Sequence, residues 1–156
     1  MAKSMWRSIG AVMAGGFCAI FVIMLLELTG HLVFPPPQEI VERLTHNDKQ
    51  VRDKALREYL PRAHLGALLT VPFAWITGTM AGAYLAGRIA KTQLLRHAIA
   101  VGFILMIGGA QTLYSLPHPP WMWGGLFAFP IGAYLGSHLA LKDTPQTEEA
   151  SSEDST

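Results

Sequence analysis

Charged residues are scarce in this sequence of 156 residues: Asp, Glu, Lys and Arg together make up 15% of it, whereas hydrophobic residues make up 51%. A soluble domain usually carries about 25% charged residues. This deficit and a mean hydropathy of +0.30 indicate that lipid solvates much of the chain. The length predicts a single domain.

Cysteine is also scarce, since Cys18 is the only one and lies within an apolar run. One cysteine forms no internal disulfide, and no cysteine spacing typical of metal sites is present. We therefore interpret Cys18 as a small packing residue. Basic residues are not interleaved with aromatic ones, so nucleic acid is not an expected partner. The sequence contains no HExxH motif, nucleophile elbow or phosphate-binding loop, so no motif points to an enzyme class.

Long apolar runs dominate what the sequence does contain. They lie at about residues 9–33, 65–87, 98–116 and 121–141, and a helix needs about 20 residues to cross roughly 30 Å of hydrocarbon. Only helices suit such runs, because every backbone polar group in lipid needs a partner within its own segment. The first run is too long for the core of a signal peptide, so we expect it to be retained. The predicted fold is an all-α integral membrane bundle of four transmembrane helices, formed by residues 1–141.

Lysine and arginine close to helix ends predict the orientation of this bundle. They are Lys3 and Arg7 before the first helix, and Arg88, Lys91 and Arg96 between the second and third. The third connection has none. Basic residues favour the cytoplasmic side, so we expect both termini in the cytoplasm and the lipid bilayer as a partner. The acidic segment 142–156 has no apolar anchor and predicts a disordered cytoplasmic tail.

The first loop, residues 34–64, would then lie outside the membrane, although it contains six basic residues mixed with acidic ones. Within it, NDKQVRDKALREYL has the pattern of an amphipathic helix. The apolar face holds Val51, Ala55, Leu56, Tyr59 and Leu60. Asn47 is the expected cap of this helix and Pro61 its expected end. The helix either lies against the membrane or the bundle, or is a soluble connector.

A repeat of small residues relates the second and fourth runs, which share GAYL at an offset of 50. The small residues are Ala74, Gly78, Gly82, Ala86 and Ala90 in the second run, and Gly124, Ala128, Gly132, Gly136 and Ala140 in the fourth. Small residues every four positions let helix backbones approach closely, within one chain or between chains. The repeat predicts two helical hairpins in parallel orientation. Pro130 is expected to remove a hydrogen bond and kink the fourth helix.

Polar side chains within the apolar runs form the candidate site. Glu27 and His31 lie one helical turn apart, and Glu27 needs a partner, a proton or water, because a carboxylate in lipid costs roughly 2.5–3.5 kcal/mol at the membrane centre. The third run and the turn after it bring Gln111, Tyr114 and His118 to the same side. These residues could form a satisfied structural network, or bind a proton, an ion or a lipid head group.

A metal ion is the one cofactor that these residues suggest. One carboxylate and two imidazoles, from Glu27, His31 and His118, can hold zinc with one coordination position left open for water. This metal site is an alternative to the structural network and to the ion site, and the sequence leaves all three open.

Five stretches together resemble a family of small four-helix bacterial membrane proteins. They are ELTGHLVFPPP, YLPRAHLGALL, GTMAGAYLAGRIA, SLPHPPWMW and PIGAYLGSHLA. The resemblance covers about residues 7–141, except most of 38–58. It implies the four-helix fold and a bacterial inner membrane. It implies no catalytic residue, because the family has no established activity.

Few polar groups and a strong small-residue pattern favour a non-enzymatic membrane protein. It would be either an accessory subunit of a membrane-protein partner or a self-associating homo-oligomer. The first alternative is a small oligomeric transporter or channel for protons, ions or lipid, in which Glu27 titrates. The second is a metal-dependent enzyme at the outer membrane surface with Glu27, His31 and His118 as ligands.

Overall fold

The computed structural model of the protein describes residues 2–116 and 118–143. Its elements, in chain order, are α1 (Ala2–Val33), α2 (Gln38–Leu44), α3 (Lys49–Tyr59), the 3-10 helix η1 (Leu60–Arg62), α4 (Leu65–Ala90), α5 (Leu94–Ser115), the 3-10 helix η2 (Pro120–Phe127) and α6 (Ala128–Lys142). No strand occurs among these described residues, so the all-α prediction is confirmed. The predicted disordered tail lies outside them from residue 144 onward.

Four segments are long and apolar enough to cross a membrane, as the sequence predicts. They are Met5–Val33, Leu65–Ala90, Leu94–Ser115 and Pro120–Lys142. The third helix begins four residues earlier than expected. Its N-cap, Gln93, and the C-cap of α4, Lys91, both adopt a left-handed backbone conformation, with φ of 51° and 60°. Two left-handed residues in so short a connection turn the chain sharply from α4 into α5.

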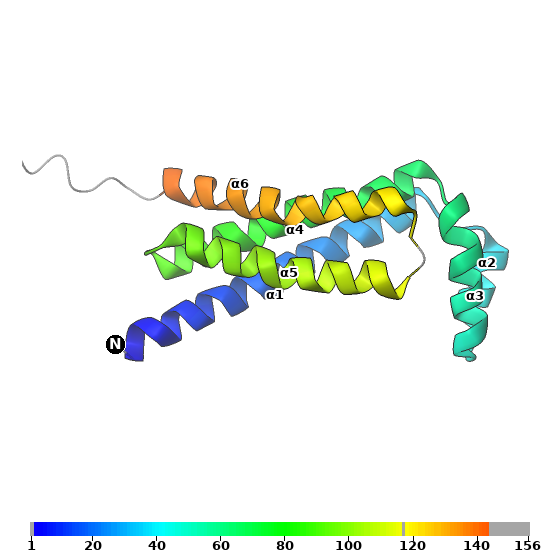
Figure 1. Ribbon diagram of the computed structural model, residues 1–156, viewed down its shortest axis with the longest axis horizontal. Coiled ribbons are helices and arrows are strands. Elements are labelled where there is room, and N and C mark those ends of the chain that lie inside the picture. The colour runs from blue at the N-terminus through cyan, green and yellow to red at the C-terminus, as the bar shows by residue number, and fades with distance from the viewer. Residues whose placement is uncertain (1, 117, 144–156) are drawn as a thin grey trace, which may run out of the picture.

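The four long helices run alternately in opposite directions (Figure 1), with α1 and α5 parallel to each other and antiparallel to α4 and α6. The helices α2 and α3 lie across one end of the bundle, which we call the α3 end. At the opposite end, which we call the α4–α5 end, α1 begins, α6 ends and α4 turns into α5. The described ends of the chain therefore lie on the same side of the bundle.

Helix α4 is the centre of the bundle, because it packs against α1, α5 and α6, whereas within the described chain α1 and α6 are not in contact. The largest core contact is between Trp75 of α4 and Phe129 of α6, whose rings stack with centroids 4.9 Å apart. Much of the remaining core consists of alanine and glycine. Such small side chains allow the backbones of neighbouring helices to approach closely, as is typical of helices that pack in lipid.

The small residues of α4 face α1. A Cβ placed on Gly78 would lie 2.8 Å from the carbonyl oxygen of Ala19, and one on Gly82 would clash with the carbonyl oxygen of Gly15. Real Cβ atoms are essentially never so close to backbone atoms. Glycine is therefore required at both positions for this helix crossing.

The small residues of α6 face α4 rather than their own hairpin partner, α5. A Cβ on Gly132 would lie 2.6 Å from the Ile76 carbonyl oxygen, and one on Gly136 would clash with the Met80 carbonyl oxygen. Both sets of small residues in the repeat therefore pack closely on a neighbouring helix, that of α4 on α1 and that of α6 on α4. We call the two sets of small residues the α4 stripe and the α6 stripe. Gly124, the first small residue of the α6 stripe, takes no part in this helix packing, because a Cβ there would meet nothing within 4 Å.

The fourth membrane-length segment is not one continuous α-helix. It begins as η2, and Pro130 is the third residue of α6. The first turn of an α-helix has no intrahelical partners for its N–H groups, so Pro130 removes no α-helical hydrogen bond. The prediction that Pro130 removes a backbone hydrogen bond from a continuous fourth helix is therefore wrong.

The amphipathic helix of the first loop is present as α3, but its N-cap is Asp48 rather than the expected Asn47. The Asp48 carboxylate accepts a hydrogen bond of 2.8 Å from the backbone N–H of Gln50. This bond needs the capping side chain directly before the first helical residue. Helix α2, which the sequence analysis did not predict, precedes α3, and an ion pair of 2.7 Å between Arg43 and Glu58 joins the two helices.

Candidate functional site

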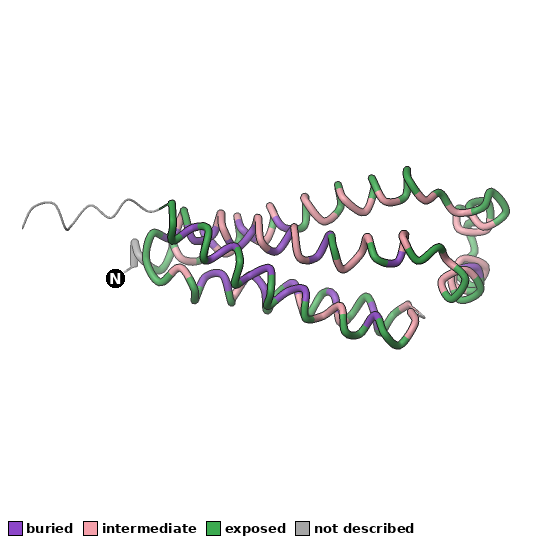
Figure 2. Tube along the Cα trace, turned by 90° about the horizontal axis from the view of Figure 1, so that it is seen from above, coloured by how far each residue is buried: buried purple, intermediate pink, exposed green. Residues whose placement is uncertain are grey.

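A cavity of about 650 Å³ lies at the α3 end between α1, α4 and α5. The long helices spread apart towards this end (Figure 2). The walls of the cavity are mainly apolar and include Ile20 and Ile23 of α1, Trp75 of α4, and Ile104 and Leu105 of α5. Five polar or titratable side chains also line it: Glu27, His31, Thr70, Thr112 and His118.

Helix α1 supplies both Glu27 and His31, because residues four apart lie on one helical face. Glu27 is half-buried, whereas His31 is exposed. The carboxyl group lies near the imidazole of His31 and near the indole of Trp75. Trp75 is 5% exposed, so its indole is held in the wall of the cavity beside the carboxyl group.

His118 reaches the cavity from the turn between α5 and η2. Its backbone N–H donates to the carbonyl oxygen of Leu116 at 2.8 Å, and its Nδ1 lies 3.1 Å from the same oxygen. A carbonyl oxygen only accepts hydrogen bonds, so Nδ1 carries a proton and, in a neutral ring, Nε2 is the acceptor. This local bonding holds the imidazole of His118 at the cavity.

Gln111 and Tyr114, which the sequence analysis grouped with these residues, do not line the cavity. Both are exposed, and Tyr114 is 85% exposed. The face of α5 that meets the cavity carries Gly108, Thr112 and Leu116 instead. Successive helix residues are rotated by about 100°, so Gln111 points well away from the direction of Thr112.

The cavity is covered at the α3 end by apolar residues of the first loop. Leu56 of α3 and Leu60 of η1 both line it, and Ala55 beside them is fully buried. Two residues of the apolar face predicted from the sequence, Leu56 and Leu60, therefore line the cavity, while the backbone of α3 contacts only α2 and η1 among the described elements. At the base of this loop, the rings of Phe34 and His64 stack with centroids 5.0 Å apart.

Sequence reasoning missed three polar groups of this cavity: the Trp75 indole and the hydroxyls of Thr70 and Thr112. The two hydroxyls donate to backbone oxygens one turn earlier, Gly66 for Thr70 at 2.9 Å and Gly108 for Thr112 at 3.0 Å. The sequence could identify them as polar residues in apolar runs. Only the positions of three helices relative to one another place them beside Glu27.

Metal binding receives no support from the arrangement of these residues. In residues 2–116 and 118–143, no group of three His, Cys, Asp or Glu side chains is close enough together to hold a metal ion. Glu27, His31 and His118 share one cavity without forming such a group. The arrangement suits a larger ligand that meets apolar walls as well as polar groups.

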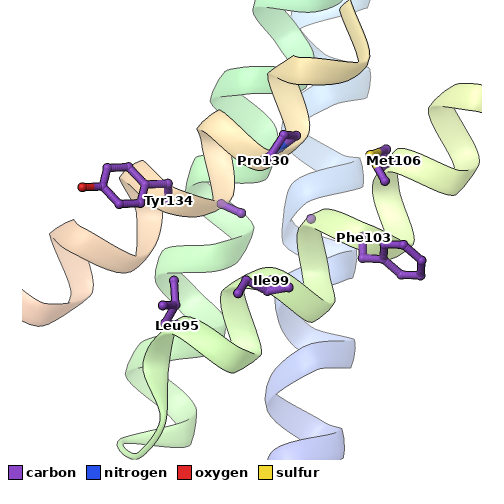
Figure 3. A pocket seen from close by; sticks show the side chains of 8 residues that line it. Leu95, Ile99, Phe103, Met106, Pro130 and Tyr134 are labelled. Carbon is purple, nitrogen blue, oxygen red and sulfur yellow. The ribbon is translucent and has the colours of Figure 1, made fainter.

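A smaller pocket of about 300 Å³ lies between α5 and α6 (Figure 3). Apolar side chains of both helices surround it, among them Ile99, Phe103 and Met106 of α5 and Pro130 of α6. Tyr134 is its one residue with a side-chain hydroxyl, and its ring meets the ring of His138 edge to face at 4.5 Å. This pocket offers contact with hydrocarbon and little else.

Comparison with known protein families, with curated proteins and with solved structures found no match. The resemblance to small four-helix bacterial membrane proteins therefore stays a prediction. The interpretation of the cavity depends on its own geometry and chemistry.

Proposed function

We propose that the four long helices span a bacterial inner membrane and that the protein is a non-enzymatic accessory protein that binds an amphiphilic molecule in the cavity at the α3 end. Both termini would lie in the cytoplasm and the α3 end outside. The basic residues between α4 and α5 support this orientation. The common location of the start of α1 and the end of α6 supports an even number of crossings.

The observation that carries this proposal is the composition of the cavity wall. Ligand pockets of roughly 300–1,000 Å³ with apolar walls and a few polar groups are typical of small-molecule sites, and this one has about 650 Å³. The apolar residues of α1 and α5 suit a hydrocarbon chain. Glu27, His31 and His118 suit a polar head group that donates or accepts hydrogen bonds.

Self-association through the small-residue stripes receives less support than binding. The stripe of α4 is covered by α1 and that of α6 by α4, so neither needs a second copy of the chain. Transport also receives less support, because α1 and α5 are in contact between the cavity and the α4–α5 end. A Cβ on Gly15 of α1 would lie 3.2 Å from Val101 of α5.

Filling the cavity tests the proposal. Gly108 lines the cavity, and a Cβ there would meet nothing within 4 Å, so Gly108→Leu should occupy the space without disturbing the helices. Native mass spectrometry of the untagged chain from a mild detergent should show a bound amphiphile above the mass of 17.0 kDa. Gly108→Leu should retain one bound amphiphile fewer than the wild type.

Gly10→Leu is the matched control, because a Cβ at Gly10 also meets nothing within 4 Å and Gly10 lies outside the cavity. This variant should keep the bound molecule. Glu27→Gln should weaken retention by replacing the carboxyl group beside the head group with a neutral amide. Equal retention in the wild type and in Gly108→Leu would contradict a ligand in this cavity.

A further inference from the structure

A pocket of about 440 Å³ lies between α1 and α5 at the α4–α5 end, the opposite end of the bundle from the cavity described above. Its polar lining consists of Ser8, Gln93, Arg96 and His97. Its apolar lining includes Ile9, Val12 and Met13 of α1. The pocket therefore has one charged side and one hydrocarbon side.

The polar side of this pocket is built by the start of α5. Arg96 is exposed, and its guanidinium donates to Oε1 of Gln93 at 3.2 Å. Since arginine carries five N–H donors, most of them are left for a ligand. His97 is only 8% exposed, and its Nδ1 is held by the carbonyl oxygen of Gln93 at 3.0 Å. A carbonyl oxygen only accepts hydrogen bonds, so Nδ1 of His97 carries a proton and, in a neutral ring, Nε2 is an acceptor that adds no donor for an anion.

The start of α5 also favours negative charge through the helix dipole. Gln93 is the N-cap of this helix, and its side chain caps no backbone N–H group. Free N–H groups at the start of a helix, together with the helix dipole, favour an anion. The N–H groups of Arg96 and His97 already donate to the carbonyl oxygen of Gln93, so the backbone contributes the dipole at the start of α5, which favours the same charge as the guanidinium of Arg96.

The charges of this end of the bundle are also complementary to an anion. Its described basic residues include Arg7, Arg88, Lys91, Arg96 and Lys142. Asp143 is the one acidic residue that the structure describes here, and its carboxylate already accepts a hydrogen bond of 2.8 Å from Tyr84. No carboxylate lines the pocket.

We propose that this pocket binds the phosphate group of an anionic phospholipid, with one acyl chain lying along α1 over Ile9, Val12 and Met13. Basic pockets between transmembrane helices are typical sites for such head groups. The apolar side favours a lipid over free phosphate, because Ile9 and Met13 are 48% and 54% exposed. The inference requires that the helices span a membrane, but it does not depend on the ligand of the other cavity.

Native mass spectrometry of the full chain tests this site. Detergent-solubilised protein is mixed with equal amounts of phosphatidylglycerol and phosphatidylcholine, and the ratio of the two retained lipids is measured. The attraction of one basic residue for an anionic lipid contributes about fivefold in binding and falls off within a Debye length of the head group. Arg96→Gln should therefore lower the preference for phosphatidylglycerol by about fivefold.

Lys142→Gln is the matched control, because Lys142 is exposed at the same end but lies on α6, away from the pocket. It makes the same change of charge and should leave the preference within twofold of the wild type. An equal fall in both variants would assign the preference to general surface charge and overturn the site. An unchanged preference in Arg96→Gln would overturn it as well.

A second arm separates the lipid from free phosphate. Inorganic phosphate and glycerol 3-phosphate carry the same anionic group without acyl chains, so they should compete poorly with phosphatidylglycerol at equal concentration. Displacement of the lipid by either compound at that concentration would show that the apolar side of the pocket contributes nothing. The site would then bind a soluble phosphate, and the lipid assignment would be wrong.

Discussion

At the scale of single residues, glycines with similar sequence surroundings differ sharply in what lies beside them. Gly82 and Gly132 are each packed against the backbone of a neighbouring helix, whereas Gly10 and Gly124 have open space. The sequence pattern identifies all of them as small residues that permit close approach. The structure decides which of them a helix does approach.

Gly82→Ala should destabilise the protein by about 1–3 kcal/mol, because the added methyl group would clash with the backbone of Gly15 in α1. Gly10→Ala should leave stability unchanged or raise it by up to about 1 kcal/mol, because alanine restricts the unfolded chain and favours the helix. Thermal unfolding in one detergent compares the two variants. A loss of stability in Gly10→Ala equal to that in Gly82→Ala would contradict this packing.

A comparison of Gly132→Ala with Gly124→Ala tests where the close packing of α6 on α4 begins. Gly132→Ala should destabilise the protein by about 1–3 kcal/mol, since its Cβ would lie 2.6 Å from the carbonyl oxygen of Ile76. Gly124→Ala should not, because that Cβ meets nothing within 4 Å. Equal losses in both variants would show that the stripe extends to Gly124, as the sequence repeat alone suggests.

Thr79 is a fully buried residue whose hydroxyl has no hydrogen-bond partner among the described residues. A buried unsatisfied polar group costs about 1–3 kcal/mol, so Thr79→Val should stabilise the protein by about 1 kcal/mol. Thr29→Val is the control, because the hydroxyl of Thr29 donates to the Leu25 carbonyl oxygen at 2.8 Å. Thermal unfolding should show a gain for Thr79→Val and none for Thr29→Val.

At the scale of elements, the first loop is held together by polar contacts and held to the bundle by apolar ones. Arg43 of α2 pairs with Glu58 of α3, while Leu56 covers the cavity. The periodicity of the sequence predicted α3 and its apolar face. It did not predict α2, because a helix of seven residues is too short for a periodic pattern to stand out.

The pairing of α2 with α3 should depend on pH. The hydrogen bond from Arg43 lowers the pKa of Glu58 below its ordinary value of 4.5. A lowered pKa in the folded state means that the pair stabilises the loop above pH 4.5 and that this contribution is lost as the pH falls through the lowered pKa. The hydrogen-exchange protection of the α2 amides, measured relative to their intrinsic exchange rate at each pH, should therefore fall in acid.

Glu58→Gln should show this lower protection already at neutral pH and should lose its acid dependence. Glu42→Gln is the control, because Glu42 is exposed on α2 and outside the ion pair. A wild-type α2 whose exchange protection stays the same from neutral pH to well below pH 4.5 would contradict the role of the pair. The effect should be small, because the pair is partly exposed to water.

At the scale of the whole molecule, the bundle has distinct ends, and the proposed orientation assigns each to one side of the membrane. In a chain whose only native cysteine is removed by Cys18→Ser, Gln50→Cys should react with a membrane-impermeant maleimide on intact bacterial spheroplasts. Lys142→Cys should react only after permeabilisation. Both positions are exposed, and both should react in permeabilised cells. The reverse pattern in intact cells would invert the orientation.

The sequence by itself determined the all-α class, the four membrane-length helices, the surface helix of the first loop and the pairing of Glu27 with His31 on one face. Each of these depends on composition or on spacing within a single segment. Only the tertiary structure decided that the α6 stripe packs on α4, that His118 shares a cavity with Glu27, and that Gln111 and Tyr114 do not. These features depend on the relative rotation and spread of helices that are far apart along the chain, and no local pattern encodes that geometry.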